Sequence, residues 1–540
     1  MLRSQRLFRI LGPVTLTASV LIVTSSSAVT TAVADPGNGR PQVSSEVRHD
    51  TSGPLRDMPS KGRSAIQREH PSKPLPFAPG TGAPDGALQL AASAPNVVTT
   101  TGANIAGVGN GDYGFAPNSA PPDTSGAVGA SQYVQWVNES FAVFDKTTGV
   151  IAAGFPKAGN TLWSGFGGGC EANNDGDPIA QYDKAAGRWV LTQFSVTTPA
   201  TYGYLQCVAV STTSDATGTY NRYAFSYGAT QFNDYPKLGV WPDGYYVTYN
   251  IFNGSTFSGS KACSLDRNKM LAGAAATQVC FQLSSSYSGL LPSDVDSTGA
   301  DAPPAGSPNY LMNFGTNSLN LWKFHVDFAA PANSTFAGPT SIPVAAFTPA
   351  CGGATCIPQP GTSQKLDSLA DRLMYRLAYR HFPDGHEALV VNQSVKVSGT
   401  KRAEVDGVRW YELRNPAAPT VFQQGTYSPD GTSRWMGSIA MDKVGNLAMG
   451  YSASSSTVYP SIRYTGRVST DPLGTMQAEN TIWAGLGSQL SNLNRWGDYS
   501  AMSVDPVDGC TFWFTTEYLK SSGTFNWSTR IASFKMPICQ

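Results

Sequence analysis

Short runs rich in Val, Tyr, Phe, Trp and Thr recur along most of the chain, separated by clusters of Gly, Pro, Asn and Asp. This is the pattern of β-strands joined by hairpin turns. Helical periodicity is almost absent, and the best short helix candidate is the stretch SLDRNKMLAGA, residues 264–274. From residue 96 to the C-terminus, the pattern therefore predicts an all-β protein.

One unit recurs in this β region: a polar loop that often carries Asp, an apolar strand, a D-x-x-G or P-D-G turn, and further strands rich in aromatic residues. Its seven copies begin at Asp123, Asp177, Asp234, Asp301, Asp371, Arg434 and Arg495. The starts are spaced by roughly 60 residues, the length of a four-stranded propeller blade with long loops. We therefore expect a seven-bladed β-propeller of four-stranded antiparallel blades over residues 96–540, rather than a pair of β-sandwiches.

The two ends of this region are expected to close the ring of blades. The stretch NVVTTTGANI, residues 96–105, has the composition of a strand that the last blade could take up. A bond between Cys510 and Cys539 would fasten the C-terminal strand. Both devices would remove an open sheet edge, which otherwise invites aggregation.

The N-terminal part of the chain has a different composition. Arg3, Arg6 and Arg9 precede an apolar stretch, and residues 32–34 form an A-x-A site, so residues 1–34 read as a secretory signal peptide. Residues 35–95 mix Pro, Gly, Ser, Arg and Asp without periodicity, which predicts a disordered linker or propeptide. Later apolar runs are too short to span a membrane, and we expect a secreted, extracellular protein.

All eight cysteines lie after the predicted signal peptide, and their even number in an exported chain favours disulfides over a metal site. Eight cysteines allow 105 connectivities. Sequence order favours local pairing, that is, Cys170 with Cys207, Cys263 with Cys280, Cys351 with Cys356, and Cys510 with Cys539.

Charge narrows the classes of partner. Lys plus Arg and Asp plus Glu both number 37, and charged residues make up only 14% of the chain. A nucleic-acid or anionic-membrane surface needs a basic stripe, which this balance argues against. We expect a monomer whose partner is an extracellular glycan or protein, with no nucleic acid and no membrane span.

Two further stretches match each other: TSDATGTY, residues 213–220, and STDPLGTM, residues 469–476. Both are similar to the Asp-box turn of the sialidase superfamily, also called the BNR type. The resemblance implies a secreted bacterial β-propeller in which Asp215 and Asp471 order turns between outer strands. No R-I-P strand of the kind by which sialidases hold sialic acid is present, so the resemblance implies the fold and not that substrate.

In a propeller, the loops that lead into the innermost strands converge at one mouth, which is the default ligand surface. Carboxylates, arginines and aromatic residues gathered there suit carbohydrate, and glycoside hydrolysis uses a pair of carboxylates. We expect Glu171 as acid/base, because glutamate is a poor turn former, with Asp177 or Asp234 as its partner and Arg495 as a cationic clamp. Further substrate-binding candidates are Asp371, Arg372, Arg434, Trp435, Trp496, Asp498 and Tyr499.

Each of these assignments has a competing interpretation. Asp at a strand entrance commonly caps backbone N–H groups, and Trp435 and Trp496 could be core between blades instead of stacking platforms. Asn173, Asp175 and Asp177 stand at alternate positions, which resembles the opening of a calcium loop. No cofactor is required for hydrolysis, and calcium is the one ion that the sequence suggests.

The leading hypothesis is a glycoside hydrolase, and its main competitor is a non-catalytic propeller that binds a glycan or a protein. A polysaccharide lyase is a lesser alternative, since DRLMYRLAYRHF, residues 371–382, combines Arg, Tyr and His. Proteases fit worse, because neither G-x-S-x-G nor H-E-x-x-H is present.

Overall fold

The computed structural model describes residues 39–64, 66–70, 73–77, 80, 82–89, 96–400 and 403–540. All described residues belong to one compact unit, Pro36–Gln540. The predicted signal peptide, residues 1–34, lies outside the described residues, so it stays a prediction.

Most strands of the described chain fall into seven groups of four, paired antiparallel within each group. The first three groups are β6 (Ser125–Val128), β7 (Gln132–Val137), β8 (Ser140–Asp145) and β9 (Lys157–Ala158); β10 (Ile179–Asp183), β11 (Arg188–Ser195), β12 (Leu205–Ser211) and β13 (Tyr220–Ser226); and β14 (Gln231–Val240), β15 (Tyr245–Asn253), β16 (Thr256–Leu265) and β17 (Thr277–Gln282).

The remaining groups are β18 (Leu291–Val295), β19 (Asn309–Gly315), β20 (Ser318–His325) and β21 (Thr335–Pro343); β24 (Met374–His381), β25 (Glu387–Ser398), β26 (Val405–Arg414) and β27 (Thr420–Tyr427); β28 (Ser433–Met441), β29 (Leu447–Ser454), β30 (Ser461–Arg467) and β31 (Asn480–Trp483); and β32 (Ala501–Val504), β33 (Thr511–Leu519), β34 (Trp527–Lys535) and β4 (Thr100–Ala106). The all-β prediction is confirmed.

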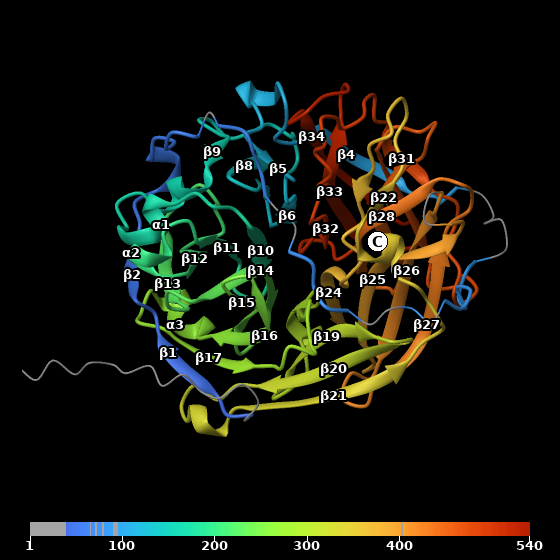
Figure 1. Cartoon of the computed structure of the whole chain (residues 1–540). Helices are drawn as coiled ribbons and strands as arrows, with labels where there is room; N and C mark the ends of the chain where they lie inside the picture. Colours follow the sequence, from blue (N-terminus) through green and yellow to red (C-terminus); the bar gives the residue numbers. More distant parts are fainter. Residues whose placement is uncertain are drawn as a thin grey trace, which may run out of the picture. The chain divides into compact units, whose positions relative to one another are not determined.

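The first strands of the seven groups contact one another in cyclic order, from β6 through β10, β14, β18, β24, β28 and β32, and β32 contacts β6 again. Figure 1 shows β6, β10, β14, β24 and β32 towards the middle of the fold and β1, β21 and β27 at its periphery. The fourth and fifth groups form one eight-stranded sheet, because β18 pairs parallel with β24 from Ser293–Leu377 to Val295–Tyr379.

The strand expected from residues 96–105 is confirmed as β4, which pairs antiparallel with β34 and completes the last group. All four expected disulfides are also present: Cys170–Cys207, Cys263–Cys280, Cys351–Cys356 and Cys510–Cys539. The first and last regions of the β fold are therefore joined by hydrogen bonds, and the C-terminal strand is fastened covalently.

Aromatic side chains fill the space between adjacent groups. Tyr133 of β7 stacks on Trp513 of β33 with ring centroids 5.4 Å apart. Tyr246 of β15 meets Phe324 of β20 edge to face at 5.1 Å. Strands such as β15 and β29 are thus buried on both faces and read as almost continuous buried runs.

The predicted disorder of residues 35–95 is wrong for the described part of that segment. β1 (Gln42–Ser45) pairs with β17, and β2 (Arg48–Thr51) pairs with β13, so each extends an outer sheet edge by one strand. β3 (Arg68–Glu69) pairs with β5 (Ser119–Ala120). The segment lacks a core of its own, and its order comes from edges and surfaces that the β fold supplies.

The fourth repeat was assigned incorrectly from Asp301. Its innermost strand is β18, and Asp301 follows this strand in the turn η4 (Gly299–Asp301). The run LPSDV of β18 is short and contains Pro and Asp, so it lacks the apolar pattern of the other innermost strands. Arg434 also differs from expectation, since it lies inside β28 and not in the loop before it.

Short helices complete the fold. They are α1 (Gly168–Ala172), α2 (Pro199–Tyr202), α3 (Arg267–Ala272), η1 (Leu55–Asp57), η2 (Asp112–Gly114), η3 (Gly159–Trp163), η5 (Pro331–Asn333) and η6 (Ala350–Gly353), and two further short strands are β22 (Thr355–Ile357) and β23 (Leu366–Asp367). α3 confirms the helix expected in residues 264–274, and Asp266 caps it by accepting a hydrogen bond from the Lys269 N–H at 3.1 Å.

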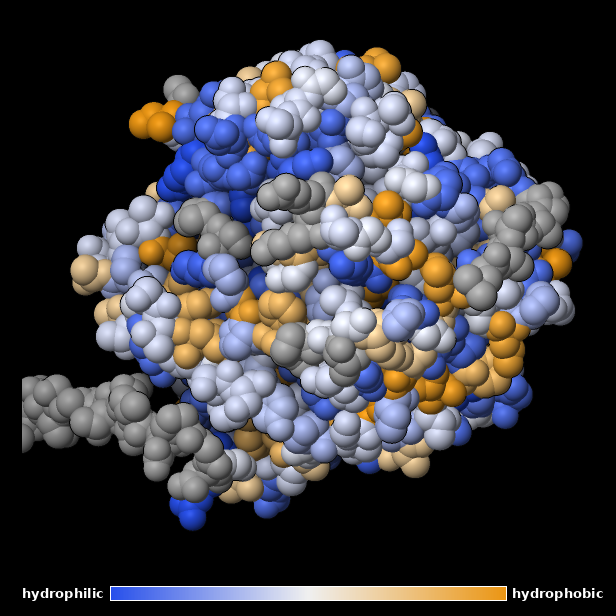
Figure 2. Space-filling view, turned by 45° about the vertical axis from the view of Figure 1, so that its right-hand side comes forward, coloured by the Kyte–Doolittle hydropathy of each residue, from blue (hydrophilic) through white to orange (hydrophobic). Residues whose placement is uncertain are grey.

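No helix among the described residues has the length and apolar character that crossing a membrane requires. The face in view in Figure 2 carries hydrophilic and hydrophobic residues side by side.

Candidate active site

Most of the innermost strands have a residue with left-handed backbone geometry, either in the segment before the strand or inside its first half. These residues are Asp123 (φ 45°), Asp177 (φ 46°), Tyr235 (φ 53°), Leu369 (φ 46°), Met436 (φ 53°) and Asp498 (φ 58°). A non-glycine residue pays a steric penalty there, which Asp tolerates better than most. All of them except Met436 line one pocket.

This pocket, the mouth pocket, has a volume of about 240 Å³. Its polar lining combines carboxylates with cationic groups, and its apolar lining includes two phenylalanine rings. The lining residues are Arg68, His70, Lys73, Asp123, Asp175, Asp177, Phe194, Val196, Thr197, Phe232, Asp234, Tyr235, Leu369, Arg372, Arg495 and Asp498. The structure therefore brings together the predicted candidates Asp177, Asp234, Arg372, Arg495 and Asp498.

Asp234 lies in β14 where the pairing with β15 shifts register, and it is half-buried. Its carboxylate makes no hydrogen bond to the part of the chain that the structure describes. Burial and the negative charge of Asp177 raise the pKa of Asp234 to about 6, although Lys73 and Arg372 act in the opposite direction. A carboxyl group with this pKa exchanges protons near neutral pH, as a general acid or base must.

Asp177 accepts a hydrogen bond from the Tyr499 hydroxyl at 3.0 Å through Oδ2. Tyr499 itself is buried. Asp177 and Asp234, each expected as a possible partner of Glu171, therefore both line the mouth pocket, without Glu171. Tyr499 positions Asp177 instead of lining the pocket.

Two more carboxylates lie deeper in the mouth pocket. Asp123 Oδ2 accepts from Asn138 Nδ2 at 3.1 Å, and Asp498 Oδ2 accepts from Arg495 Nη2. The Oδ1 atoms of both aspartates are buried without a hydrogen-bond partner among the described residues. Burial raises the pKa of both groups, and their mutual repulsion with Asp177 adds to this effect.

The two arginines of the pocket are held by acidic neighbours. Arg372 donates from Nε to Asp371 Oδ1 at 2.6 Å, and its guanidinium lies over the Tyr235 ring at 4.3 Å. Arg495 pairs with Asp498 and, at 3.5 Å, with Asp367. Both cations are therefore fixed in position before any ligand arrives.

Sequence reasoning missed Lys237, which lies beneath the pocket. Its ammonium is sandwiched between the rings of Tyr235 and Tyr499, at 3.3 and 3.4 Å from their centroids. Burial lowers its pKa well below the ordinary range. A lysine inside the apolar run KLGV was the available signal.

Glu171 is not brought to the mouth pocket. Its carboxylate in α1 accepts from the N–H groups of Gly165 and Gly167 at 3.0 and 2.7 Å and from Lys61 Nζ at 2.9 Å. These hydrogen bonds, that from Lys61 first, lower the pKa of Glu171 to about 2. The expectation that glutamate is not needed for a turn overlooked that its longer side chain can reach back to a glycine-rich loop.

Asn173 and Asp175, expected as calcium ligands with Asp177, make hydrogen bonds to the end of β11 and to the connection that follows it. Asn173 donates to Ser195 and Thr198, both at 2.9 Å, and Asp175 accepts from the N–H groups of Val196 and Thr197 at 2.6 and 2.8 Å. Among the described residues, the one cluster of potential metal ligands is Cys351, Cys356, Glu404 and Asp406, whose two cysteines form a disulfide. Calcium binding stays a prediction.

Arg434, Trp435 and Trp496 are buried away from the mouth pocket. Trp435 and Trp496 pack against each other with ring centroids 6.0 Å apart, and both are fully buried. Arg434 forms a two-point ion pair with Glu479 at 2.8 and 2.7 Å. The structure favours the core interpretation for both tryptophans.

The N-terminal segment contributes three residues to the mouth pocket that sequence reasoning did not select: Arg68, His70 and Lys73. Arg68 pairs with Glu139 at 3.2 Å, and the Lys73 ammonium lies over the Phe232 ring at 3.3 Å. The segment carried no signal of its own, because its place is set by contacts with residues distant in sequence.

Neither a scan with protein-family models nor a search of curated proteins finds a match. Among solved structures, the chain is similar to an endo-arabinase from Bacteroides thetaiotaomicron, with 12% identity over 53% of this chain and 92% of that one and a TM-score of 0.27. It is also similar to an exo-β-1,3-galactanase from Clostridium thermocellum (10% identity, 77% and 91% covered, TM-score 0.29) and to an ulvan lyase (10% identity, 84% of each chain covered, TM-score 0.28). At these values, the likenesses assign neither an activity nor a substrate.

Proposed function

We propose that the protein is a seven-bladed β-propeller that hydrolyses glycosidic bonds of an extracellular glycan at the mouth pocket. The observation that carries this proposal is the Asp234 carboxylate, which faces the pocket without a hydrogen bond to the described chain and has a pKa of about 6 beside Asp177. A non-catalytic mouth would be expected to saturate its carboxylates with backbone N–H groups.

The propeller assignment rests on the cyclic contacts of the seven innermost strands and on the return of β4 to the last group. The turns at Asp215 and Asp471 support the resemblance to the sialidase superfamily by their position alone, between two outer strands of a group. Asp215 accepts from the Thr217 N–H at 2.9 Å between β12 and β13, and Asp471 accepts from the Val468 N–H at 3.0 Å between β30 and β31.

In the proposed reaction, protonated Asp234 gives its proton to the departing glycosidic oxygen. Asp177, oriented by Tyr499, acts as the second carboxylate, which attacks the anomeric carbon or deprotonates a water. Arg372 and Arg495 hold substrate hydroxyls, and the rings of Phe194 and Phe232 offer apolar surface to sugar faces. Glu171 is not part of this mechanism.

The test is an activity screen on a polysaccharide panel that includes arabinan, β-1,3-galactan, xylan and ulvan, with reducing ends as readout. Asp234→Asn and Asp177→Asn are each expected to lower kcat at least about a hundredfold, the usual contribution of acid–base catalysis. Glu171→Gln is the control and is expected to keep the wild-type kcat. An Asp234→Asn protein with unchanged kcat would refute the assignment.

A non-catalytic glycan- or protein-binding propeller is the second candidate, favoured by the backbone hydrogen bonds that occupy Asp175. Binding without release of reducing ends from any polysaccharide would favour it. A lyase would instead give unsaturated products that absorb ultraviolet light. Secretion accords with the four disulfides, and a monomeric state remains part of the proposal.

A further inference from the structure

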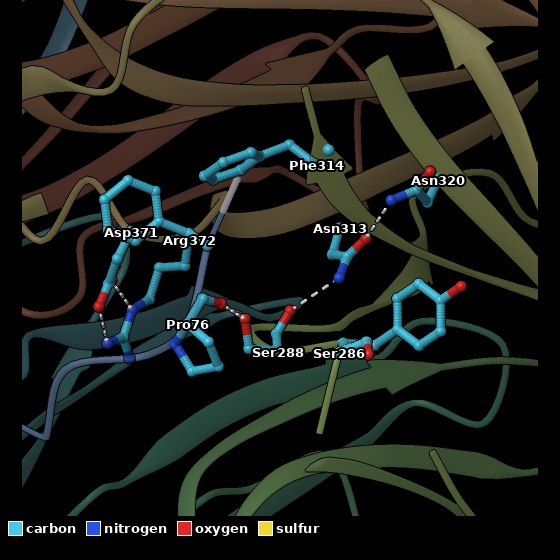
Figure 3. Close-up of a pocket in the computed structure, with 11 residues that line it drawn as sticks. Pro76, Ser286, Ser288, Asn313, Phe314, Asn320, Asp371 and Arg372 are labelled. Carbon is cyan, nitrogen blue, oxygen red and sulfur yellow. Dashed lines mark hydrogen bonds and ion pairs between the residues drawn. The ribbon is translucent and has the colours of Figure 1, made fainter. Parts of the chain in front are cut away.

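A second pocket, the outer pocket, adjoins the mouth pocket and has a volume of about 270 Å³. Arg372 lines both pockets. Figure 3 shows the Asp371–Arg372 pair at one side of the outer pocket and the amides of Asn313 and Asn320 at the other.

The lining of the outer pocket suits an uncharged sugar. Its charged groups among the described residues are Asp371 and Arg372, which neutralise each other at 2.6 and 3.1 Å. The remaining lining offers amides and aromatic rings, including Asn320, Tyr287 and Phe314. Amides bond to sugar hydroxyls, and rings cover the apolar faces of sugars.

Part of the N-terminal segment separates the two pockets. We call its described residues 66–70 and 73–77 the strap. Lys73 lines the mouth pocket, whereas Pro76 and Phe77 line the outer pocket. Between them, Leu75 is buried, and its N–H donates to Asp371 Oδ2 at 2.9 Å. Ser288 Oγ donates to the Pro76 carbonyl at 2.5 Å.

The strap also occupies groups that the proposed function assigns to the substrate. The His70 carbonyl accepts from Arg495 Nε at 3.2 Å. The Lys73 ammonium covers the Phe232 ring at 3.3 Å and acts electrostatically on Asp234. A sugar chain that bound to Arg495, Phe232 and Asp371 would need the same positions.

The first part of the strap is tied to the fold, because β3 pairs with β5 and the His70 N–H donates to the Ala120 carbonyl at 2.7 Å. Its second part, residues 73–77, has fewer ties. Residues 73–77 belong to no strand, and Pro74 and Pro76 have no N–H to donate. Leu75 is the one residue of this stretch with a fully buried side chain. By contrast, β1 and β2 are each tied to an outer edge by a four-residue register.

We propose that the mouth pocket and the outer pocket are two ends of one binding groove for an oligosaccharide, and that the strap is an inhibitory segment that fills its middle until displaced. The proposal rests on the proposed function and adds that the substrate is an extended chain, uncharged at the outer end. Displacing the strap joins the pockets around Arg372.

The test compares Leu75→Ser with wild type, both in an Asp234→Asn background that prevents turnover. The probes are oligosaccharides from disaccharide to octasaccharide, prepared from each polysaccharide of the panel, and isothermal titration calorimetry measures Kd. Losing the buried leucine is expected to lower the equilibrium constant for docking of the strap at least about tenfold. The apparent Kd of the longer oligosaccharides falls in proportion when the groove of the parent protein is mostly filled.

Leu55→Ser is the matched control, because Leu55 is an equally buried leucine of the N-terminal segment that lines neither pocket. It is expected to leave Kd unchanged. Lys73→Ala, at a half-buried position, provides a second strap variant that does not threaten folding and is expected to tighten binding in the same direction.

Equal or weaker binding by both strap variants would overturn the inhibitory strap while leaving the proposed function intact. A gain as large for disaccharides as for octasaccharides would overturn the single groove. If no probe binds to any of the proteins and no polysaccharide is cleaved by wild type, the proposed function fails and the strap proposal fails with it.

Discussion

Replacing Asp234 with Asn is expected to lower kcat at least about a hundredfold and, at neutral pH, to stabilise the fold. The pKa of Asp234 is raised from its ordinary 3.8 to about 6 by burial and by the neighbouring charge of Asp177. This difference of about two pKa units corresponds to about 3 kcal/mol of unfavourable free energy for the ionised group in the folded protein.

Between pH 3.8 and about 6, the folded state holds a proton on Asp234 that the unfolded chain has already released. The free energy of unfolding of the wild type therefore falls as the pH rises through this window. Above about pH 6 the full loss of stability has occurred. Below pH 3.8 the folded and the unfolded protein both carry the proton, so Asp234 no longer affects stability. Asp234→Asn should gain up to about 3 kcal/mol near pH 7.5 and almost nothing near pH 3.5.

Differential scanning calorimetry at these two pH values measures the effect. An unfolding entropy of about 2 cal/mol/K per residue gives a fold of roughly 500 residues about 1 kcal/mol/K, so the expected rise in Tm is about 3 °C at the higher pH. Glu171→Gln is expected to lower Tm at neutral pH, the opposite of Asp234→Asn. The pKa of Glu171 is lowered to about 2, so its negative charge stabilises the fold at neutral pH. A Tm gain for Asp234→Asn that is absent near pH 7.5, or equal at both pH values, would refute the reasoning.

Three further changes test other parts of the structure. Asp177→Asn removes the negative charge that raises the pKa of Asp234. In the remaining activity, the fall of kcat/KM with pH that reports the ionisation of Asp234 should therefore shift to lower pH. An unshifted pH profile would contradict the interaction between the two carboxylates. Replacing Cys510 and Cys539 with Ser opens a link that spans 29 residues, and chain entropy predicts a loss of about 4 kcal/mol, measured by denaturant unfolding under non-reducing conditions. Gly239→Ala places a Cβ 2.2 Å from a carbonyl oxygen of β18, so a loss of about 1 to 3 kcal/mol is expected, and an unchanged Tm would argue against this contact.

The repeated hairpins were readable from the sequence because each is a local pattern. The strands β14 and β15 flank the P-D-G turn at residues 242–244, and the strands β28 and β29 flank the turn that begins with Asp442. β18 was not predicted, because its position depends on a parallel pairing with β24, more than 80 residues later. Sequence patterns carry no such long-range information.

The mouth pocket was readable in part for the same reason. Asp177, Asp234 and Asp498 were selected because they stand at the expected entrances to innermost strands, and the contacts between these strands bring them together. Glu171 was selected by residue type, and its side chain meets a local glycine-rich loop instead. Lys73 and His70 could not be selected, because a segment without periodicity gives no indication of the surface that it covers.

The acid cluster at the mouth follows from a requirement of the backbone. At several innermost strands the chain adopts a left-handed residue, and Asp fills this position in three of them: Asp123, Asp177 and Asp498. Asp tolerates the geometry, so a conformational requirement repeated at several innermost strands places carboxylates in one small pocket. Their repulsion and burial then raise the pKa of neighbouring groups, Asp234 among them. Asp234 itself has ordinary backbone geometry and only precedes the left-handed Tyr235. Its carboxylate is therefore not needed to stabilise the turn and is available to bind and release a proton.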